Sequence, residues 1–376
     1  MLSKSKKWQE STLKHKKIHS NHCQIIYKPI TCQDRALAQI YNTWEIHMTF
    51  MKTIMSATAT LVASAAMVVA DPALIYDLGG KFDKSFNEAA YEGAEKWKAE
   101  TGGSYNEIEL QNEAQREQAL RRFAENGNNP IVMAGFSFAS SLSEVAPDFP
   151  DTKFVIIDMV VDAPNVRSTV FKEQEGSYLV GMMAAMASES GTVGFVGGMD
   201  IPLIRRFACG YVLGVRSINS DAKIIQNYTG TTYHAWNDPI KGGELTKAQI
   251  SQGADVVYHA AGGTGLGVLQ AAADAGKLGI GVDKNQNHLQ SGSVLTSMVK
   301  RVDVAVYNAF TQGAGLTTGF DVMGLSNGGV GYSMDSHNAS LVSADMEAAV
   351  EAAKAKIIAG EIEIHDAMSD NSCPAS

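Results

Sequence analysis

Residues 193–219 read VGFVGGMDIPLIRRFACGYVLGVRSIN. This stretch begins with an apolar run of strand length at 193–196, continues through a turn containing Gly and Pro, and ends in a stretch of helix length over 203–219. Such a succession is typical of one strand–helix unit of an α/β protein. The stretch therefore predicts a buried strand whose carboxyl end leads directly into a helix.

The same unit recurs along the chain in both directions. Apolar runs of strand length lie at 73–76, 131–133, 154–157, 193–196, 256–258 and 278–282. Helical stretches lie near 84–101, 114–126, 172–189, 203–219, 239–252, 265–276, 302–315 and 343–359. Continuous apolar strands that alternate with helices indicate parallel sheets covered on both faces, and this many strands favour two sheets over one. We predict two α/β lobes, with a ligand cleft at the carboxyl ends of their strands.

Charge is distributed unevenly over the 376 residues. The chain has 31 Lys and Arg against 40 Asp and Glu, and residues 1–50 hold eight of the basic and three of the acidic ones. The remaining 326 residues are therefore strongly acidic. An acidic surface argues against nucleic-acid binding, which needs Lys and Arg to displace phosphate counterions.

Residues 51–74 read MKTIMSATATLVASAAMVVADPAL. A positive start at Lys52, a short apolar run over 54–69 and small residues before Asp71 match a secretory signal peptide over 51–70. Residues 1–50 are then interpreted as an extension upstream of the true start, at Met51 or Met48. The apolar run is not followed by a nearby Cys, so we expect a periplasmic protein without a lipid anchor.

Two of the four cysteines, Cys209 and Cys373, belong to the expected mature chain. An oxidising compartment allows a disulfide between them, but a buried Cys209 with a free thiol at Cys373 is equally compatible with the sequence. Several enzyme signatures are missing: GxxxxGK[ST], HExxH and the GxGxxG spacing do not occur. The histidines form no metal-spaced cluster, so we expect no catalytic residue, no metal and no cofactor.

Polar and aromatic residues gather where the predicted strands end. The loop at 77–87, DLGGKFDKSFN, follows the first strand, and there Asp83 or Ser85 could cap the next helix while Phe86 could stack on a flat ligand. Asp158 and Asp283 end two further strands, where carboxylates can bind vicinal hydroxyls or simply cap loops. Gly262 and Gly263 open a helix and could offer N–H groups to a ligand or only form a tight turn. The candidate ligand-binding residues are Asp77, Ser85, Phe86, Asn87, Asp158, Phe207, Trp236, Gly262, Gly263, Asp283 and Lys300.

Long stretches of the chain resemble one known family, the BMP (basic membrane protein) family of ABC-transporter substrate-binding proteins, which includes purine-nucleoside receptors. The matching stretches are DKSFNEAAYEGAEKW at 83–97, VGFVGGMDIPLIRRFACGYVLGV at 193–215, WNDPIKGGELTKAQISQGADVVYHAAGGTGLGVLQAA at 236–272, IGVDKNQN at 280–287 and VLTSMVKRVDVAVY at 294–307. The resemblance runs from about Ala73 to the end of the chain.

The resemblance implies two Rossmann-like lobes joined by a hinge, the type I periplasmic-binding fold. The N-terminal lobe would comprise 71–172 and about 299–330, and the C-terminal lobe 173–298 and about 331–376. It also implies that Phe86 and Phe207 stack on a purine, that Asp158 and Asn87 face the base, and that Asp283 and Lys300 hold the ribose near the Gly262–Gly263 turn. The implied partners are a purine nucleoside or base and the permease and ATPase subunits of an ABC importer, with the binding protein a monomer.

Other functions remain open on the sequence alone. A flavin or a sugar would suit the same kind of cleft, as would the ligand of a signalling receptor. A secreted nucleoside hydrolase is the enzymatic alternative, although the Asp-rich run DxDxxxDD that such enzymes usually carry is absent.

Overall fold

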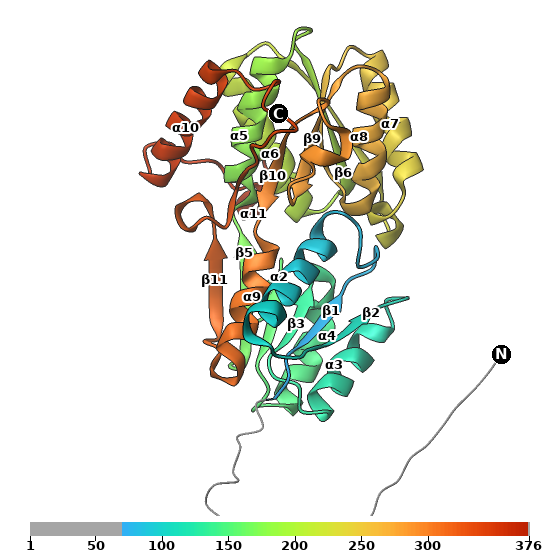
Figure 1. Ribbon diagram of the computed structural model, residues 1–376, viewed down its shortest axis with the longest axis vertical. Coiled ribbons are helices and arrows are strands. Elements are labelled where there is room, and N and C mark those ends of the chain that lie inside the picture. Colours follow the sequence, from blue (N-terminus) through green and yellow to red (C-terminus); the bar gives the residue numbers. More distant parts are fainter. Residues whose placement is uncertain (1–69, 375–376) are drawn as a thin grey trace, which may run out of the picture. The chain divides into compact units, whose positions relative to one another are not determined.

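The computed structural model describes residues 70–374 (Figure 1). The predicted extension over 1–50 and residues 51–69 of the predicted signal peptide lie outside the described residues. Across 70–374, no helix combines the length and the apolar character needed to cross a membrane.

The first sheet has six strands, all parallel. From edge to edge they are β11 (Gly319–Met323), β5 (Val166–Phe171), β4 (Phe154–Ile157), β3 (Ile131–Ala134), β1 (Ala73–Tyr76) and β2 (Asn106–Glu109). The helices around it are α2 (Phe86–Thr101), α3 (Gln115–Glu125), α4 (Ala139–Val145) and α9 (Val302–Gln312). We call this sheet with these helices the N-terminal lobe.

Alternate residues of β1 show why its sequence is apolar throughout. Leu74 and Tyr76 belong to one buried cluster together with residues of α2, whereas Ala73 and Ile75 belong to a second cluster with residues of α3 and α4. Both faces of the strand are therefore covered, as the continuous apolar run predicted.

The second sheet also has six strands, and these form the C-terminal lobe. Their order is β12 (Val330–Tyr332), β10 (Val294–Lys300), β9 (Leu278–Asp283), β8 (Val256–Ala260), β6 (Thr192–Met199) and β7 (Lys223–Gly230). All neighbours are parallel except the edge strand β12, which runs antiparallel to β10. The accompanying helices are α5 (Glu173–Ala187), α6 (Pro202–Ile218), α7 (Pro239–Ser251), α8 (Gly265–Asp274), α10 (Ala344–Ile358) and the short α11 (Ala367–Asp370). The predicted fold class, two parallel-sheet α/β lobes, is confirmed.

The apolar pattern missed several strands, β5 and β10 among them. Both are interior strands, but they contain buried hydroxyl residues, Ser168 and Thr169 in β5 and Thr296 and Ser297 in β10. These hydroxyls find hydrogen-bond partners in the fold; Thr296, for example, donates to the carbonyl of Ser333 at 2.8 Å. A search for uninterrupted apolar runs passes over such strands.

Three segments connect the lobes: β5 to α5, β10 to α9, and β11 to β12. They are hydrogen-bonded to one another, because Lys172 N–H donates to the Met323 carbonyl and Arg301 N–H to the Gly329 carbonyl, each at 2.9 Å. The first and third segments meet again where Leu325 N–H donates to the Glu175 carboxylate at 2.8 Å. The hinge is thus one joined unit.

Helices α5 and α6 pack unusually close together. A Cβ atom at Gly210 would overlap the carbonyl oxygen of Gln174, and one at Gly214 would overlap that of Tyr178. The glycines in the opening stretch of sequence therefore allow α6, with Phe207, to lie directly against α5. Of the two alternatives for the cysteines, the structure has the disulfide: Cys209 of α6 is bonded to Cys373, with 5.6 Å between their Cα atoms.

Candidate ligand-binding site

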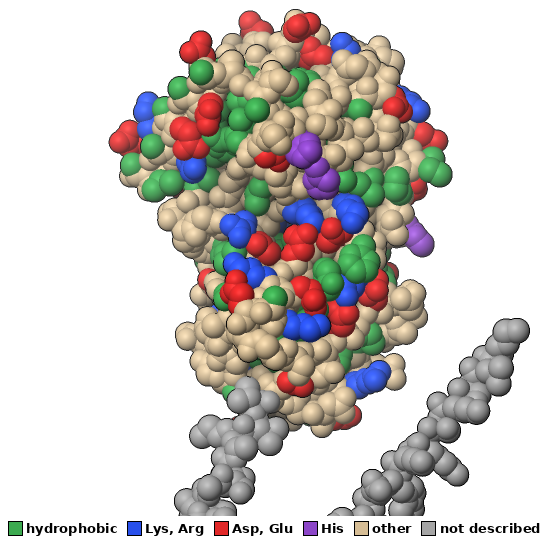
Figure 2. All heavy atoms as spheres, in the orientation of Figure 1, with side chains coloured by type: hydrophobic (Ala, Val, Ile, Leu, Met, Phe, Trp, Pro, Cys, Tyr) green, Lys and Arg blue, Asp and Glu red, His purple; other side chains and the backbone are tan. Residues whose placement is uncertain are grey.

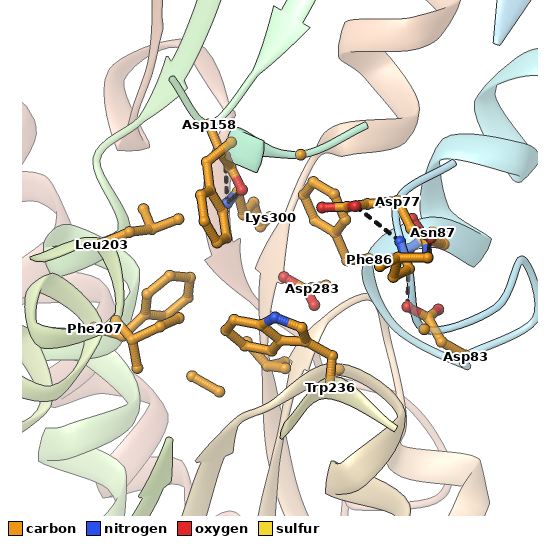
Figure 3. Close-up of a pocket in the computed structure, with 18 residues that line it drawn as sticks. Asp77, Asp83, Phe86, Asn87, Asp158, Leu203, Phe207, Trp236, Asp283 and Lys300 are labelled. Atoms are coloured by element: carbon orange, nitrogen blue, oxygen red, sulfur yellow. Dashed lines mark hydrogen bonds and ion pairs between the residues drawn. The ribbon is translucent and has the colours of Figure 1, made fainter. Parts of the chain in front are cut away.

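A pocket of about 630 Å³, counting the part open to solvent, lies between the lobes at the carboxyl ends of the strands (Figure 3). Nine of the eleven candidate residues line it: Asp77, Phe86, Asn87, Asp158, Phe207, Trp236, Gly262, Asp283 and Lys300. The lining also includes Asp83, which the sequence singled out only as a possible helix cap. The other lining residues were not singled out: Leu78, Gly79, Gly135, Phe136, Leu203, Ile204, Ala260 and Val282.

The two remaining candidates lie immediately beside the lining. Ser85 donates its hydroxyl to the Asp283 carboxylate at 2.5 Å, a bond that joins the two lobes. Gly263 lies beside Asp83: a Cβ atom built on Gly263 would be 3.6 Å from the Cβ of Asp83. The structure therefore brings all eleven predicted residues to one region.

Aromatic rings come from opposite sides of the pocket. Phe86 opens α2 in the N-terminal lobe, and Phe207 lies in the second turn of α6 in the C-terminal lobe (Figure 3). The ammonium of Lys300 is 5.3 Å from the centre of the Phe86 ring and 5.4 Å from that of Phe207. Both rings thus face the same buried cation, and a flat ligand could enter between them.

Lys300, the last residue of β10, is 2% exposed. Its ammonium lies 2.6 Å from Asp158 of the N-terminal lobe and 2.9 Å from Glu173 at the start of α5. Burial lowers the pKa of Lys300, but the charges of Asp158, Glu173 and Asp283 outweigh burial and raise it overall. Lys300 therefore stays charged, while burial raises the pKa of both Asp158 and Asp283.

Asp158 and Asp283 share an uncommon backbone conformation. Each directly follows or ends a strand, β4 and β9 respectively, with φ of 73° and 67°. Left-handed φ values are disfavoured for residues other than glycine and persist where surrounding structure enforces them. Both lobes thus use a strained Asp at a strand end to direct a carboxylate into the pocket.

The loop before α2 shows which residue caps this helix, a choice between Asp83 and Ser85 that the sequence left open. Asp83, not Ser85, caps the helix: its carboxylate accepts from the N–H groups of Ser85, Asn87 and Glu88 at 2.8, 3.0 and 3.1 Å. Asn87 donates its amide to the carbonyls of Asp77 and Gly80, both at 3.1 Å. Its Oδ1 atom is buried with no hydrogen-bond partner, so it can accept from a ligand in the pocket.

Asp77 is already well supplied with partners inside its own lobe. It accepts from Ser137 at 2.6 Å, from Leu78 N–H at 2.8 Å and from Arg116 at 3.2 Å. Arg116, which the sequence did not single out, lies 39 residues further along the chain, so no local pattern could have shown the pair. Any contact between Asp77 and a ligand stays a prediction.

Trp236 and the Gly262 turn form the wall on the side of the C-terminal lobe. The indole lies against β6, where a Cβ atom at Gly198 would overlap the ring. Asp238 caps α7 by accepting from Lys241 N–H at 2.9 Å. Gly262 has a φ of 56° and lies against the Trp236 carbonyl, which explains a glycine at this position.

The lobes also touch beside the pocket. Lys284 pairs with Glu88 at 2.9 Å and with Glu92, and Gln286 donates to the Lys84 carbonyl at 2.8 Å. Figure 2 shows acidic and basic side chains gathered between the lobes across the middle of this face. Because these bonds span the cleft, the structure represents the closed arrangement of the lobes.

Within residues 70–374, no group of three or more His, Cys, Asp or Glu side chains is placed to hold a metal ion. The polar side-chain groups of the pocket lining are carboxylates, one ammonium, one amide and one indole N–H. These groups can bind hydroxyl and N–H groups of an uncharged polar ligand.

Two α/β lobes that enclose an aromatic and polar pocket at their strand ends define a solute-binding protein. A family model described as "ABC transporter substrate-binding protein PnrA-like" matches residues 72–368. The chain belongs to this family, which confirms the resemblance to the basic membrane proteins; the family comprises binding proteins rather than enzymes.

Relatives and solved structures agree with this assignment. The "CD4+ T-cell-stimulating antigen" of Listeria monocytogenes is 35% identical and the "ABC transporter nucleoside-binding protein BmpA" of Lactococcus lactis 33% identical, each over 78% of this chain and 87% or 88% of its own. An uncharacterised lipoprotein of Pyrococcus furiosus is 36% identical over 69% of each chain. An ABC-transporter solute-binding protein of Aeropyrum pernix matches with a TM-score of 0.72 at 28% identity, over 82% of this chain and 99% of its own.

We predict that Lys300→Met strongly destabilises the ligand-free protein. Removing the ammonium leaves Asp158 and Glu173 buried without their shared cation, and breaking a buried ion pair in this way costs about 3–5 kcal/mol. Chemical denaturation measures the free energy of unfolding. The double variant Lys300→Met with Asp158→Asn should recover part of the loss, because it removes one of the unpaired charges.

Lys354→Met is the matched control for this prediction. Lys354 also pairs with a carboxylate, Glu351, but at the surface, where such pairs contribute about 0–1 kcal/mol. Equal effects of the Lys300 and Lys354 variants would contradict a structural role for the buried ammonium.

Proposed function

We propose that this protein binds a purine nucleoside, or a free purine base, in the cleft between its lobes and delivers it to the permease of an ABC importer. The observation that carries the proposal is the pairing of Phe86 and Phe207, from opposite lobes, around a buried cluster of one ammonium and several carboxylates. The relative from Lactococcus lactis named as nucleoside-binding supports the same ligand class.

The base would occupy the space between the two aromatic rings. Stacking on an aromatic side chain contributes about 1–3 kcal/mol per base, so two rings can supply much of the affinity. The unpartnered Oδ1 of Asn87 would accept from an N–H group on the base edge, and Asp158 would face the same edge. These contacts favour a flat ligand with polar groups on its rim.

The sugar would lie toward Asp283 and Lys300. The Asp283 carboxylate accepts one hydrogen bond, from Ser85, and so retains acceptor capacity for vicinal hydroxyls. Gly262 and Gly263 would lie close to the sugar, and Trp236 would close the pocket beside it. A ligand without these hydroxyls would leave buried acceptors unpaired, at a cost of about 1–3 kcal/mol each.

Closure links ligand binding to delivery. A ligand that touches Phe86 and Phe207 at once contacts both lobes, and it therefore stabilises the closed arrangement over an open one. The closed arrangement also forms the Lys284–Glu88 and Gln286–Lys84 bonds. A permease that recognises both lobes in this arrangement would accept the loaded protein in preference to the empty one.

The same proposal places the protein in the periplasm as a monomer without a lipid anchor and without catalytic activity. The apolar run at 54–69 is followed by no Cys before Cys209, which supports the absence of an anchor, although relatives include named lipoproteins. Release by osmotic shock without detergent would match this location, whereas retention in the membrane fraction would contradict it.

We expect calorimetric titration to detect binding of at least one of adenosine, guanosine, inosine and adenine. Riboflavin and ribose serve as the flavin and sugar alternatives in the same panel. Binding of riboflavin or ribose alone would replace the purine assignment. Chromatography of the nucleoside after long incubation should recover it intact, and released base would reveal a hydrolase instead.

We predict that Phe207→Leu weakens purine binding about 10- to 100-fold, the loss of one stacking partner. Leucine keeps most of the buried volume, so the folded structure should persist, as a thermal unfolding scan would verify. Phe320→Ala, which changes an exposed ring on β11, is the control. Unchanged affinity of Phe207→Leu would remove this ring from the site.

A further inference from the structure

A continuous line of charged side chains runs from the pocket to the C-terminal tail. Lys300, which contacts Asp158 in the pocket, lies 2.9 Å from Oε1 of Glu173. The other oxygen of Glu173, Oε2, accepts from Arg206 at 3.0 Å. Arg206 in turn donates from Nε and Nη2 to the two oxygens of Asp366, at 2.8 and 2.7 Å.

Because these charged side chains are buried, the position of each one depends on its neighbour in the line. Glu173 is fully buried, and the Arg206 side chain is 12% exposed. A buried carboxylate is stable only where cations or donors surround it, and Glu173 divides its two oxygens between Lys300 and Arg206. Arg206 therefore fixes the orientation of Glu173, and Glu173 fixes that of the ammonium. Arg206 also donates to the carbonyl of Phe171 at 2.8 Å, at the end of β5, where the hinge segment to α5 begins.

The tail that supplies Asp366 is held on α6 by a covalent bond. Asp366 caps α11 by accepting from Met368 N–H at 2.9 Å, and Cys373, just beyond that helix, is bonded to Cys209 of α6. Cys209 lies one turn beyond Arg206 in α6. The disulfide and the ion pair therefore hold the C-terminal tail against the same part of this helix. The family match ends at residue 368, and Cys373 therefore lies outside it.

We propose that Asp366, held in place by the Cys209–Cys373 disulfide, is a positioning residue of the ligand site. The disulfide keeps Asp366 on Arg206, and through Glu173 this contact holds the Lys300 ammonium where it meets the ligand. Asp366 and the two cysteines thus act on binding without touching the ligand. For the ligand this inference rests on the proposed function, but the positioning of Lys300 can be tested with no ligand present.

The first test uses the ligand-free, oxidised protein and hydrogen exchange. Asp366→Asn retains the size and the capping ability of the side chain but removes its charge. We expect the hinge amides of Lys172, Glu175 and Arg301 to exchange about tenfold faster, because a lost charge-assisted bond loosens the segment. Asp370→Asn, which changes an exposed tail carboxylate paired with His365, should leave these rates unchanged.

Two further variants separate the tail from general effects on α6. Arg205→Ala removes the neighbouring arginine, which pairs at the surface with Asp200, and should not alter the hinge amides. The double variant Cys209→Ala with Cys373→Ala should raise their exchange as Asp366→Asn does. Unchanged hinge exchange in both the Asp366 and the double-cysteine variants would overturn the proposal whatever the protein binds.

The second test measures affinity for inosine and for 2′,3′-dideoxyinosine, which lacks the hydroxyls that Lys300 would hold. Asp366→Asn and the double-cysteine variant should bind inosine about tenfold more weakly than wild type, with a smaller loss for the dideoxy analogue. A purely structural tail would lower the unfolding temperature and leave the affinities unchanged, and that outcome would overturn the proposal.

Reduction with dithiothreitol provides an independent test of the disulfide's role. Dithiothreitol reduces the disulfide to two thiols while becoming a cyclic disulfide itself, so it should weaken inosine binding by wild type but not by the double-cysteine variant. If the wild-type protein binds no nucleoside, the proposed function fails while the hydrogen-exchange test still decides the role of the tail.

Discussion

The burial of the Lys300 ammonium dictates how the two lobes of this protein come together. The ammonium is buried at the point where β10 leaves the C-terminal lobe for the hinge, and it pairs with Asp158 from the N-terminal lobe and Glu173 from the start of α5. A cation removed from water requires nearby carboxylates. The lobes meet this requirement jointly, so the floor of the pocket exists only where they come together.

The two lobes contribute to the pocket in closely similar ways. Each presents a carboxylate from a left-handed residue at a strand end, Asp158 after β4 and Asp283 at the end of β9. Each also presents an aromatic ring from the helix that follows a strand, Phe86 from α2 and Phe207 from α6. Neither half alone encloses a ligand, and a ligand held by both favours closure.

Local patterns predicted much of the fold. The bounds of β1 and β4 agree with the apolar runs at 73–76 and 154–157, because strands covered on both faces need uninterrupted apolar residues. β5 and β10 escaped notice because buried Ser and Thr interrupt them. In the site, the sequence pointed to the loop at 77–87 and to the strand-end Asp residues, because each directly follows or ends a predicted strand. It did not point to the charged residues Arg116, Glu173, Arg206 and Asp366, since an ion pair between distant segments leaves no periodic signal.

By itself the sequence determined the uninterrupted apolar strands, the long helices, and which strand ends carry polar and aromatic residues, because these depend on neighbours a few positions away. Tertiary structure alone decided the pairings between distant segments. Lys300 meets Asp158 across 142 positions, Arg206 meets Asp366 across 160, and Cys209 meets Cys373 across 164. It also decided that Asp83 rather than Ser85 caps α2, since Ser85 turns instead to Asp283 of the other lobe. Such choices follow from which groups packing brings together and buries, a property of the whole fold.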